Sequence, residues 1–282
     1  MDAYFCTAVA SFFVTRRDQS LPETRGELEA EITRFSYPGT DTDILCGIHF
    51  RLPPGGMLGI CGPTGSGKTT LLSLIQRHYD LSEGHIDYHG YPLPALLLDG
   101  WRQRLAVVNQ TPFLFSDTIA NNIALGAPQA SRDQIEQAAM LASVHEDILH
   151  LPDGYDTQVG ERGVMLSGGQ KQRISLARAL LMNAEILILD DALSAVDGET
   201  EHRILSRLQE WRAGKTVIIT AHRLSALRGA DEILVLQQGR ITQRGTAAVL
   251  AEEAGWYREM SQYQKMAESL SQHIEHPQPK EH

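Results

Sequence analysis

Short, mainly apolar runs recur along the chain, and polar residues of chemical interest follow several of them. The runs lie at residues 57–61, 105–109, 186–189 and 216–220. A run of this length, bounded by polar residues, is typical of a strand that is buried on both faces of a parallel sheet. The pattern therefore predicts an α/β core whose strands end at a common edge, which is where open α/β sheets bind ligands.

Other stretches predict two additions to this core. Alternating short strands over residues 28–62, with another strand at 84–88, fit an antiparallel β layer. A helical lobe is expected at about residues 111–165. Within it, residues 131–134 form a capping box that opens a helix over 135–142.

The two ends of the chain differ from this central unit, which we expect to span residues 28–255. Residues 1–27 have the composition of a leader or linker. The apolar stretch at 4–14 within them is too short for a transmembrane helix, which needs about 20 apolar residues. Residues 256–270 predict an amphipathic helix, so that 256–282 form a terminal helix followed by a polar tail.

The segment at residues 62–69 has the G-x-x-x-x-G-K-[ST] pattern of a phosphate-binding loop, and a predicted helix at 70–75 follows it. Glycines in such a loop let backbone N–H groups approach phosphates, and the helix N-terminus adds a favourable dipole. Lys68 can reach the β- and γ-phosphates, and the Thr69 hydroxyl can ligate Mg²⁺. A glycine-rich surface turn is the alternative, which the flanking strand and helix disfavour. The nucleotide-binding residues expected here are Gly62, Pro63, Thr64, Gly65, Ser66, Gly67, Lys68, Thr69 and Thr70.

A second helix start has similar chemistry. Ser167 can cap a helix predicted over 171–181, and the two glycines that follow Ser167 leave N–H groups of its first turn open to an anion. Taken alone, an ordinary capped helix explains this segment equally well. The candidate residues are Ser167, Gly168, Gly169 and Gln170.

Polar residues follow the remaining apolar runs. Asp190 and Asp191 come directly after the run at 186–189. His222 follows the fourth run and Gln110 the second. Taken singly, an aspartate can merely terminate a strand and a histidine can be structural. Their common position after parallel strands predicts that they gather beside the phosphate loop.

The ordered set resembles an ATP-binding cassette (ABC) ATPase, and the resemblance covers the whole central unit. Lys68 lies at the position of the Walker A lysine, and Asp190 at that of the Walker B aspartate. Residues 166–170 match the signature motif, residues 194–197 match the D-loop, and His222 matches the switch histidine. This resemblance implies a P-loop NTPase fold with a RecA-like core, an antiparallel β layer and a helical subdomain.

Further roles are implied by the same resemblance. Gln110 matches the Q-loop glutamine that ligates Mg²⁺, and Tyr37 matches the aromatic residue that stacks on adenine. Residues 157–163 resemble the X-loop of exporters. ATP and Mg²⁺ are the implied cofactors. The implied metal ligands are Thr69, Gln110 and Asp190, the implied catalytic residues are Asp191, His222, Gln110 and Lys68, and Tyr37 and Asp197 join the nucleotide site.

Partners are implied too, because in this family each ATP lies between Walker A of one cassette and the signature motif of another. The expected partner is a second cassette, in a heterodimer or alternatively a homodimer. A transmembrane domain is expected to dock near Gln110 and residues 113–115, although those aromatic residues fit a helical-lobe core almost as well. The chain would then be peripheral, at the cytoplasmic face of the inner (plasma) membrane.

One residue departs from the family pattern. The position after Walker B is usually a glutamate that polarises the attacking water, and here it is Asp191. Aspartate is one methylene shorter, so its carboxylate would lie about 1 Å further back, which can cost on the order of 100-fold in rate. Either backbone adjustment restores the distance, or this chain has a slow site and its signature motif completes a faster site on a partner. We favour the second interpretation.

Composition narrows the partners and the compartment. The net charge of −10 and the pI near 5.5 leave no basic footprint, so nucleic acid is not an expected partner. Cys6, Cys46 and Cys61 are widely spaced and form no C-x-x-C pair, which indicates a reducing compartment. Cys61 is expected to be buried beside the phosphate loop.

Two functions remain open at this stage. The first is the ATPase subunit of an exporter, similar to multidrug-resistance-like half-exporters, which the X-loop favours. The second is a soluble cassette that acts as a regulatory or binding module without transport. Such half-exporters carry a membrane domain ahead of the cassette, and this sequence has none, so we expect a truncated exporter or a separate subunit. A cassette does not reveal the transported substrate, because substrate contacts lie in the membrane domain.

Overall fold

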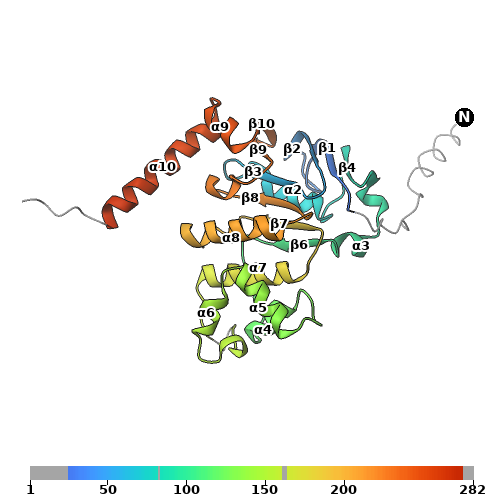
Figure 1. Ribbon diagram of the computed structural model, residues 1–282. Coiled ribbons are helices and arrows are strands. Elements are labelled where there is room, and N and C mark those ends of the chain that lie inside the picture. Colours follow the sequence, from blue (N-terminus) through green and yellow to red (C-terminus); the bar gives the residue numbers. More distant parts are fainter. Residues whose placement is uncertain (1–24, 82, 161–163, 276–282) are drawn as a thin grey trace, which may run out of the picture.

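A computed structural model describes residues 25–81, 83–160 and 164–275 of the chain, with the side chains of residues 268 and 270–275 left undescribed. Figure 1 shows a body built around two sheets, a helical lobe below it and a long C-terminal helix that extends from it. Residues 1–24 of the leader or linker predicted over 1–27, and residues 276–282 of the predicted polar tail, lie outside the described residues.

The central sheet contains the predicted buried strands side by side. Its order is β10-β9-β3-β8-β7-β6. The five strands from β9 to β6 run parallel, and β10 pairs antiparallel with β9 at one end. The bounds are β3 Met57–Cys61, β6 Leu105–Val108, β7 Ile186–Asp190, β8 Thr216–Thr220, β9 Glu232–Gln237 and β10 Arg240–Gly245.

A second, antiparallel sheet has the order β2-β1-β4-β5. Its bounds are β1 Leu28–Phe35, β2 Leu45–Leu52, β4 Glu83–Tyr88 and β5 Tyr91–Pro92. The expected antiparallel layer is therefore confirmed, but its extent over residues 28–62 is wrong in one respect. Strand β3, at the end of that range, belongs to the parallel sheet, because all five of its residues are buried and neither face suits a half-exposed layer.

Helices cover the sheets and form the lower lobe. The predicted capping box is confirmed at Ser131, which caps α5 together with Gln134. The helices expected after the phosphate loop and after Ser167 are confirmed as α2 and α7. Their bounds are α2 Lys68–Ile75, α3 Leu98–Arg102, α4 Ile119–Ala124, α5 Arg132–Leu141, α6 His145–Leu149, α7 Gly168–Leu181, α8 Gly198–Trp211, α9 Ala247–Glu252 and α10 Trp256–Glu275, with 3-10 turns η1 Leu93–Ala95, η2 Gly154–Asp156 and η3 Leu224–Leu227.

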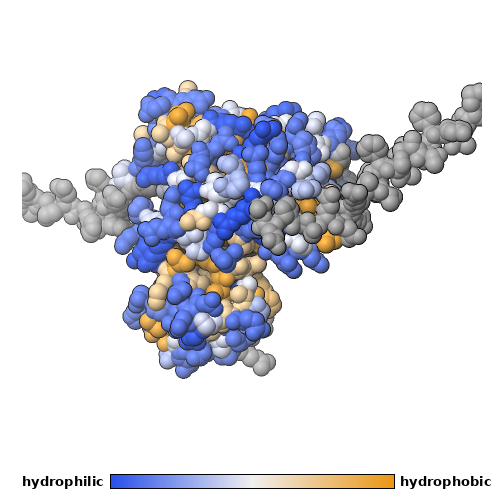
Figure 2. Space-filling view, turned by 45° about the vertical axis from the view of Figure 1, so that its right-hand side comes forward, coloured by the Kyte–Doolittle hydropathy of each residue, from blue (hydrophilic) through white to orange (hydrophobic). Residues whose placement is uncertain are grey.

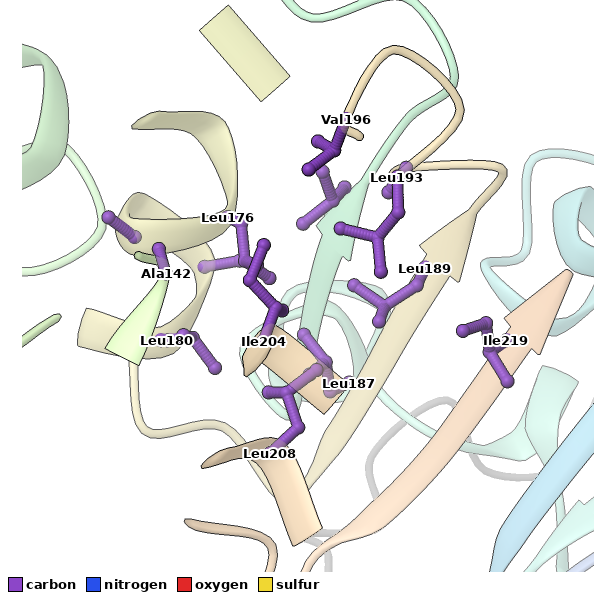
Figure 3. Close-up of a cluster of buried hydrophobic side chains, with 14 of the residues drawn as sticks. Ala142, Leu176, Leu180, Leu187, Leu189, Leu193, Val196, Ile204, Leu208 and Ile219 are labelled. Carbon is purple, nitrogen blue, oxygen red and sulfur yellow. The ribbon is translucent and has the colours of Figure 1, made fainter. Parts of the chain in front are cut away.

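Apolar packing occupies both faces of the parallel sheet. In β7, Ile186 and Ile188 join the cluster beneath the antiparallel sheet, whereas Leu187 and Leu189 join the cluster that reaches the helical lobe. Figure 3 shows the second cluster, in which α7 and α8 pack against these strands. Because alternate residues point to opposite faces, a strand covered on both sides must be apolar throughout, as the sequence predicted.

The surface is mainly hydrophilic, with hydrophobic residues gathered at the waist between the body and the lower lobe on the face shown in Figure 2. The predicted terminal helix is confirmed as α10, which continues to Glu275. No helix among the described residues is long and apolar enough to cross a membrane. The short apolar stretch at residues 4–14 lies outside them.

Candidate nucleotide-binding site

Four neighbouring strands of the parallel sheet deliver the predicted polar residues to one edge. Strand β3 leads into the phosphate loop, β8 leads to His222, β7 ends in Asp190, and Gln110 follows β6. A cleft of about 210 Å³ opens at this edge. Its lining comprises Ile44, Thr64, Gly65, Ser66, Gly67, Lys68, Thr69, Thr70, Gln110, Asp190, Asp191, Thr220, Ala221 and His222.

The phosphate loop needs glycine at two positions for geometric reasons. Gly62 has φ +141°, and a Cβ there would lie 1.9 Å from the carbonyl oxygen of Leu236. Gly67 has φ +103°, and a Cβ would lie 2.6 Å from Cδ2 of Leu45. Both conformations are in the region that L-residues rarely adopt. The loop therefore turns tightly against the two sheets before α2 begins, as a backbone cradle for phosphates requires.

Lys68, the first residue of α2, is held inside this loop. Its Nζ donates to the carbonyl oxygens of Gly62 at 2.8 Å and Pro63 at 3.0 Å, and lies 3.5 Å from Oγ of Ser66. Burial lowers the pKa of Lys68, and the nearby acidic groups, including Asp190, partly oppose that effect. A buried cation whose hydrogen-bond acceptors are all neutral is suited to bind an anion such as a phosphate.

Cys61 ends β3 directly below the loop and is fully buried, as the sequence predicted. Burial raises the pKa of its thiol to about 12. The thiol therefore stays protonated at neutral pH and acts as a small apolar side chain.

Thr220 links the two aspartates at the end of β7. Its Oγ1 donates to Oδ1 of Asp190 at 2.6 Å and accepts from the backbone N–H of Asp191 at 3.0 Å. Asp190 is 9 % exposed, so its carboxylate is fixed and only partly open to the cleft. The hydroxyl of Thr220 thus sets the positions of both residues, a role that the sequence pattern did not reveal.

The carboxylate of Asp191 lies between two of the other predicted catalytic residues, Gln110 and His222. Oδ2 accepts from Nε2 of Gln110 at 3.3 Å, and Oδ1 accepts from the backbone N–H of His222 at 3.4 Å. Asp191 has φ +47°, a left-handed conformation that aspartate tolerates better than most residues. The structure therefore brings Gln110, Asp191 and His222 together, as predicted.

The signature residues lie outside this cleft, whose lining includes none of them. Ser167 caps α7 as predicted, because its Oγ accepts from the backbone N–H of Gln170 at 3.1 Å. The side chain of Gln170 in turn accepts from the backbone N–H of Ser167 at 3.0 Å, which completes a capping box. A Cβ on Gly169 would lie 2.8 Å from the carbonyl oxygen of Ala195, so the helix start is packed against the D-loop.

Asp197 ends the D-loop and caps α8. Its Oδ1 accepts from the backbone N–H of Thr200 at 2.9 Å, and this hydrogen bond lowers the pKa of the Asp197 carboxyl. The predicted D-loop aspartate therefore has a structural role in this chain. Asp197 is exposed, and Ala195 of the same D-loop packs against Gly169 of the signature motif. Asp197 and the signature motif therefore lie at the same surface, outside the cleft.

Gln172 is a further residue that the sequence analysis missed. Its side chain is 2 % exposed and connects three motifs. Nε2 donates to the carbonyl oxygen of Gln110 at 3.4 Å and to Oγ of Ser194 at 3.1 Å, and Oε1 accepts from the N–H of Ala195 at 2.9 Å. A polar residue on the buried face of the predicted helix at 171–181 was the available signal.

Tyr37 lies in a group of three aromatic residues beside the loop. Its ring meets Phe35 and Tyr79 edge to face, with centroid distances of 5.3 and 5.0 Å. Its hydroxyl is 2.8 Å from Oγ1 of Thr70, which lines the cleft. The structure thus places Tyr37 next to the cleft rather than in its lining, and Tyr79 is a second aromatic residue there.

We expect Tyr37→Ala to weaken ATP binding by about 3- to 10-fold, because aromatic stacking contributes about 0.5–1.5 kcal/mol. Tyr37→Trp should preserve the affinity. Tyr37→Phe, which removes only the hydrogen bond to Thr70, is the control and should bind like the wild type. Titration with a fluorescent ATP analogue measures all four proteins. Equal affinities throughout would remove Tyr37 from the site.

A second surface lies on the helical lobe. Phe113 and Phe115 are 63 % and 51 % exposed and meet edge to face at 4.9 Å, beside a hollow of about 670 Å³. Leu114 between them packs against the core. The alternative that both aromatic rings form the lobe's core is therefore wrong, because alternate side chains of this extended segment point outwards. Residues 157–160 of the predicted X-loop lie nearby, with Gly160 lining the same hollow, and 161–163 lie outside the described residues.

The fold and the cleft together define a nucleotide-binding ATPase cassette. The family model described as ABC transporter matches residues 45–194, and the chain belongs to that family. The family's α/β cassette fold, with an antiparallel sheet and a parallel core sheet, is therefore confirmed.

Similar proteins narrow the position within the family. The multidrug resistance-like ATP-binding protein MdlA of Escherichia coli is 67 % identical over 89 % of this chain and 43 % of its own length. The ATP-dependent lipid A-core flippase of Legionella pneumophila is 46 % identical over 86 % of this chain and 41 % of its length. The structure of a bacterial Atm1-family ABC exporter with ATP bound superposes with a TM-score of 0.83 at 41 % sequence identity. The match covers 87 % of this chain and 43 % of the exporter chain. The chain spans less than half the length of these relatives.

Proposed function

We propose that this cassette is the ATP-hydrolysing part of an exporter of the multidrug or lipid type, and that it works in a dimer with a second cassette. The observation that carries the proposal is the separation of two anion-binding helix starts. Lys68 lies in the cleft, whereas Ser167 lies outside its lining. Because the phosphate loop and the signature motif of one chain lie apart, neither forms a complete ATP site alone. A second cassette would supply the missing half of each site.

The cleft fits ATP with Mg²⁺. Lys68 has neutral acceptors that phosphate oxygens would replace, and the glycine positions let the loop turn tightly around a phosphate. Thr69, Gln110 and Asp190 line the same cleft and would hold the metal ion. One carboxylate with neutral oxygen ligands suits Mg²⁺, which is usually bound through one or two carboxylates and substrate phosphates. When bound, Mg²⁺ would neutralise charge on the β- and γ-phosphates.

The residues around Asp191 would prepare the attacking water. Asp191 accepts long hydrogen bonds from the side chain of Gln110 and from the backbone of His222, so both neighbours orient its carboxylate without fixing it. The carboxylate would accept a hydrogen bond from the water, and the exposed His222 ring would face the γ-phosphate. Positioning and electrostatic stabilisation account for most of the catalysis in phosphoryl transfer.

A slow own site is part of the proposal. The shorter Asp191 side chain supports it. On the similarity to MdlA we also propose a heterodimer with an MdlB-like subunit. The signature motif of this chain would then complete the faster site of that partner. A homodimer is the alternative assembly.

The aromatic surface would be the site of coupling to a transmembrane domain. Phe113 and Phe115 expose two rings beside a hollow, and the X-loop residues lie next to it. Docking there would place the chain at the cytoplasmic face of the inner membrane. The alternative function is a cassette that regulates or binds without transport. It does not explain why the rings of Phe113 and Phe115 are exposed. A neighbouring coding sequence with membrane spans and a second cassette would favour the exporter.

The test is steady-state ATPase activity of a mixed dimer with an MdlB-like partner. We expect Ser167→Ala in this chain to lower turnover roughly tenfold or more, because a hydrogen bond to a charged group contributes about 1.5–3 kcal/mol. Asp191→Asn should lower it less, because the partner's site hydrolyses faster.

Ser131→Ala is a matched control, because Ser131 caps α5 through the same capping box but lies away from the signature motif. Both variants lose a helix cap, and only Ser167→Ala should reduce turnover strongly. Equal losses in the two serine variants, or a larger loss in Asp191→Asn, would contradict the shared-site arrangement.

A further inference from the structure

The C-terminal helix reaches the switch-histidine segment through one side chain. Gln264 of α10 accepts at Oε1 from the backbone N–H of Leu224 at 3.0 Å. Its Nε2 donates to the carbonyl oxygen of His222 at 2.7 Å. One amide group therefore holds both sides of Arg223, in the turn that follows strand β8.

The first turns of helix α10 are docked against the body of the cassette. Tyr257 is 3 % exposed, and its N–H donates to Oε1 of the buried Gln243 at 3.1 Å. Met260 packs against the main apolar cluster. Tyr257, Met260 and Gln264 follow a spacing of three and four residues, which places them on one helix face. Gln264 occupies a position where this face would otherwise continue as apolar.

Arg223 carries the constraint from the switch segment to the D-loop. Its Nη2 donates at 2.6–3.0 Å to the carbonyl oxygens of two D-loop residues and of the residue just before the D-loop, and its guanidinium pairs with the buried Glu201 at 3.1 Å. The carbonyl oxygens belong to Leu193, Ser194 and Val196.

The same segment also contacts the reacting region. The backbone N–H of His222 donates to Asp191, and the His222 carbonyl accepts from Gln264. The two groups flank one Cα, so a shift of the carbonyl turns the His222 side chain and its N–H together. A displacement of about 1 Å at such a residue can cost on the order of 100-fold in rate.

We propose that Gln264 is a positioning residue for hydrolysis, which sets the switch histidine through its two backbone hydrogen bonds. The inference rests on the proposed role of His222 and goes beyond it. It assigns to the C-terminal helix, which lies outside the family match at residues 45–194, a part in the chemistry of the cleft. Figure 1 shows α10 beginning beside α9 and extending beyond the body.

The experiment compares Gln264→Ala, Gln264→Glu and Gln262→Ala in the full 282-residue chain. Gln262 is an exposed residue on the same helix and serves as the matched control. Single-turnover hydrolysis with the cassette in excess over ATP resolves slow rates, and its concentration dependence gives the ATP affinity. We expect both Gln264 variants to lower the rate constant about tenfold, with affinity changed less than twofold, because a modest misplacement affects the reaction and not binding. Gln264→Glu tests the donor, because a carboxylate cannot donate to the His222 carbonyl.

Hydrogen exchange provides a second readout. The amide of Leu224 should exchange faster in Gln264→Ala than in the wild type, since Gln264 is its acceptor. An unchanged rate constant, or a loss of affinity that accounts for the loss of activity, would overturn the proposal. His222→Ala is measured in parallel. Wild-type hydrolysis by His222→Ala would refute the role of His222 in the proposed function, whereas inactive His222→Ala with fully active Gln264→Ala would refute only the inference on Gln264.

Discussion

Lys68→Ala is expected to abolish ATP-dependent dimer closure and nearly all turnover. Lys68 is the buried cation of the phosphate loop, and its Nζ is held at 2.8 and 3.0 Å from the carbonyl oxygens of Gly62 and Pro63. Alanine leaves the charge of the β- and γ-phosphates without the cation of the phosphate loop. Removing one such electrostatic contact costs roughly 100- to 1,000-fold in rate. Steady-state ATPase activity and ATP-dependent dimerisation measure the two effects.

Lys215→Ala is a suitable control for this substitution. Lys215 is 9 % exposed, and burial lowers the pKa of its side chain as it does for Lys68. Its Nζ lies 3.6 Å from the ring centroid of Trp211, at the start of β8 and so at the opposite edge of the sheet. We expect this variant to lose some stability but to keep its ATPase activity. Wild-type affinity and turnover in Lys68→Ala would refute the assignment of the phosphate loop.

The residues that the sequence predicted well are those whose positions follow from strand order. Asp190, His222 and Gln110 each lie within two residues of the end of an apolar run, and parallel pairing brings such residues to one edge. The phosphate loop was predicted for the same reason, with the added signal of its glycines. The apolar runs and the rule that parallel strands end at one edge were enough to predict where these residues lie. No side-chain contact between distant parts of the chain had to be known.

The residues that the sequence did not reveal act through backbone groups far away in the chain. Thr220, Gln172 and Arg223 each form a hydrogen bond with a backbone group in the segment between β7 and α8. These backbone groups belong to Asp191, Ala195 and Val196, respectively. Gln264 reaches back 42 positions to His222. Such contacts depend on how helices pack and not on spacing along the chain. The range 28–62 expected for the antiparallel layer also extended over β3, although the apolar run at 57–61 had itself predicted a buried strand of the parallel sheet.

The exposed pair Phe113 and Phe115 shows a further limit. Their alternation with Leu114 is compatible with either a core or a docking surface, and only the solvent exposure of 63 % and 51 % decides between them. For Tyr37 the aromatic character was clear, but the neighbouring Tyr79 comes from a distant loop and could not be paired with it from the sequence.

The second large effect concerns Asp191. If its short side chain makes this site slow, the purified cassette should hydrolyse ATP feebly, and Asp191→Glu should raise the rate. The added methylene moves the carboxylate about 1 Å towards the attacking water, a distance that is worth on the order of 10- to 100-fold. The hydrogen bonds from Gln110 and His222 are long, at 3.3 and 3.4 Å, so the carboxylate has room to move outwards.

The backbone conformation at position 191 makes the same substitution destabilising. Asp191 has φ +47°, and glutamate tolerates this conformation less well than aspartate, so Asp191→Glu should lower the free energy of unfolding by about 1 kcal/mol. A more active and less stable variant is therefore the expected result. Thermal unfolding and steady-state ATPase activity, for the cassette alone and with an MdlB-like partner, measure the two changes. Asp191→Asn is the control, because it keeps the size and removes the charge, and it should change the slow wild-type rate little. A fast wild-type homodimer that loses its activity in Asp191→Asn would show that Asp191 is a competent base and that the site is not degenerate.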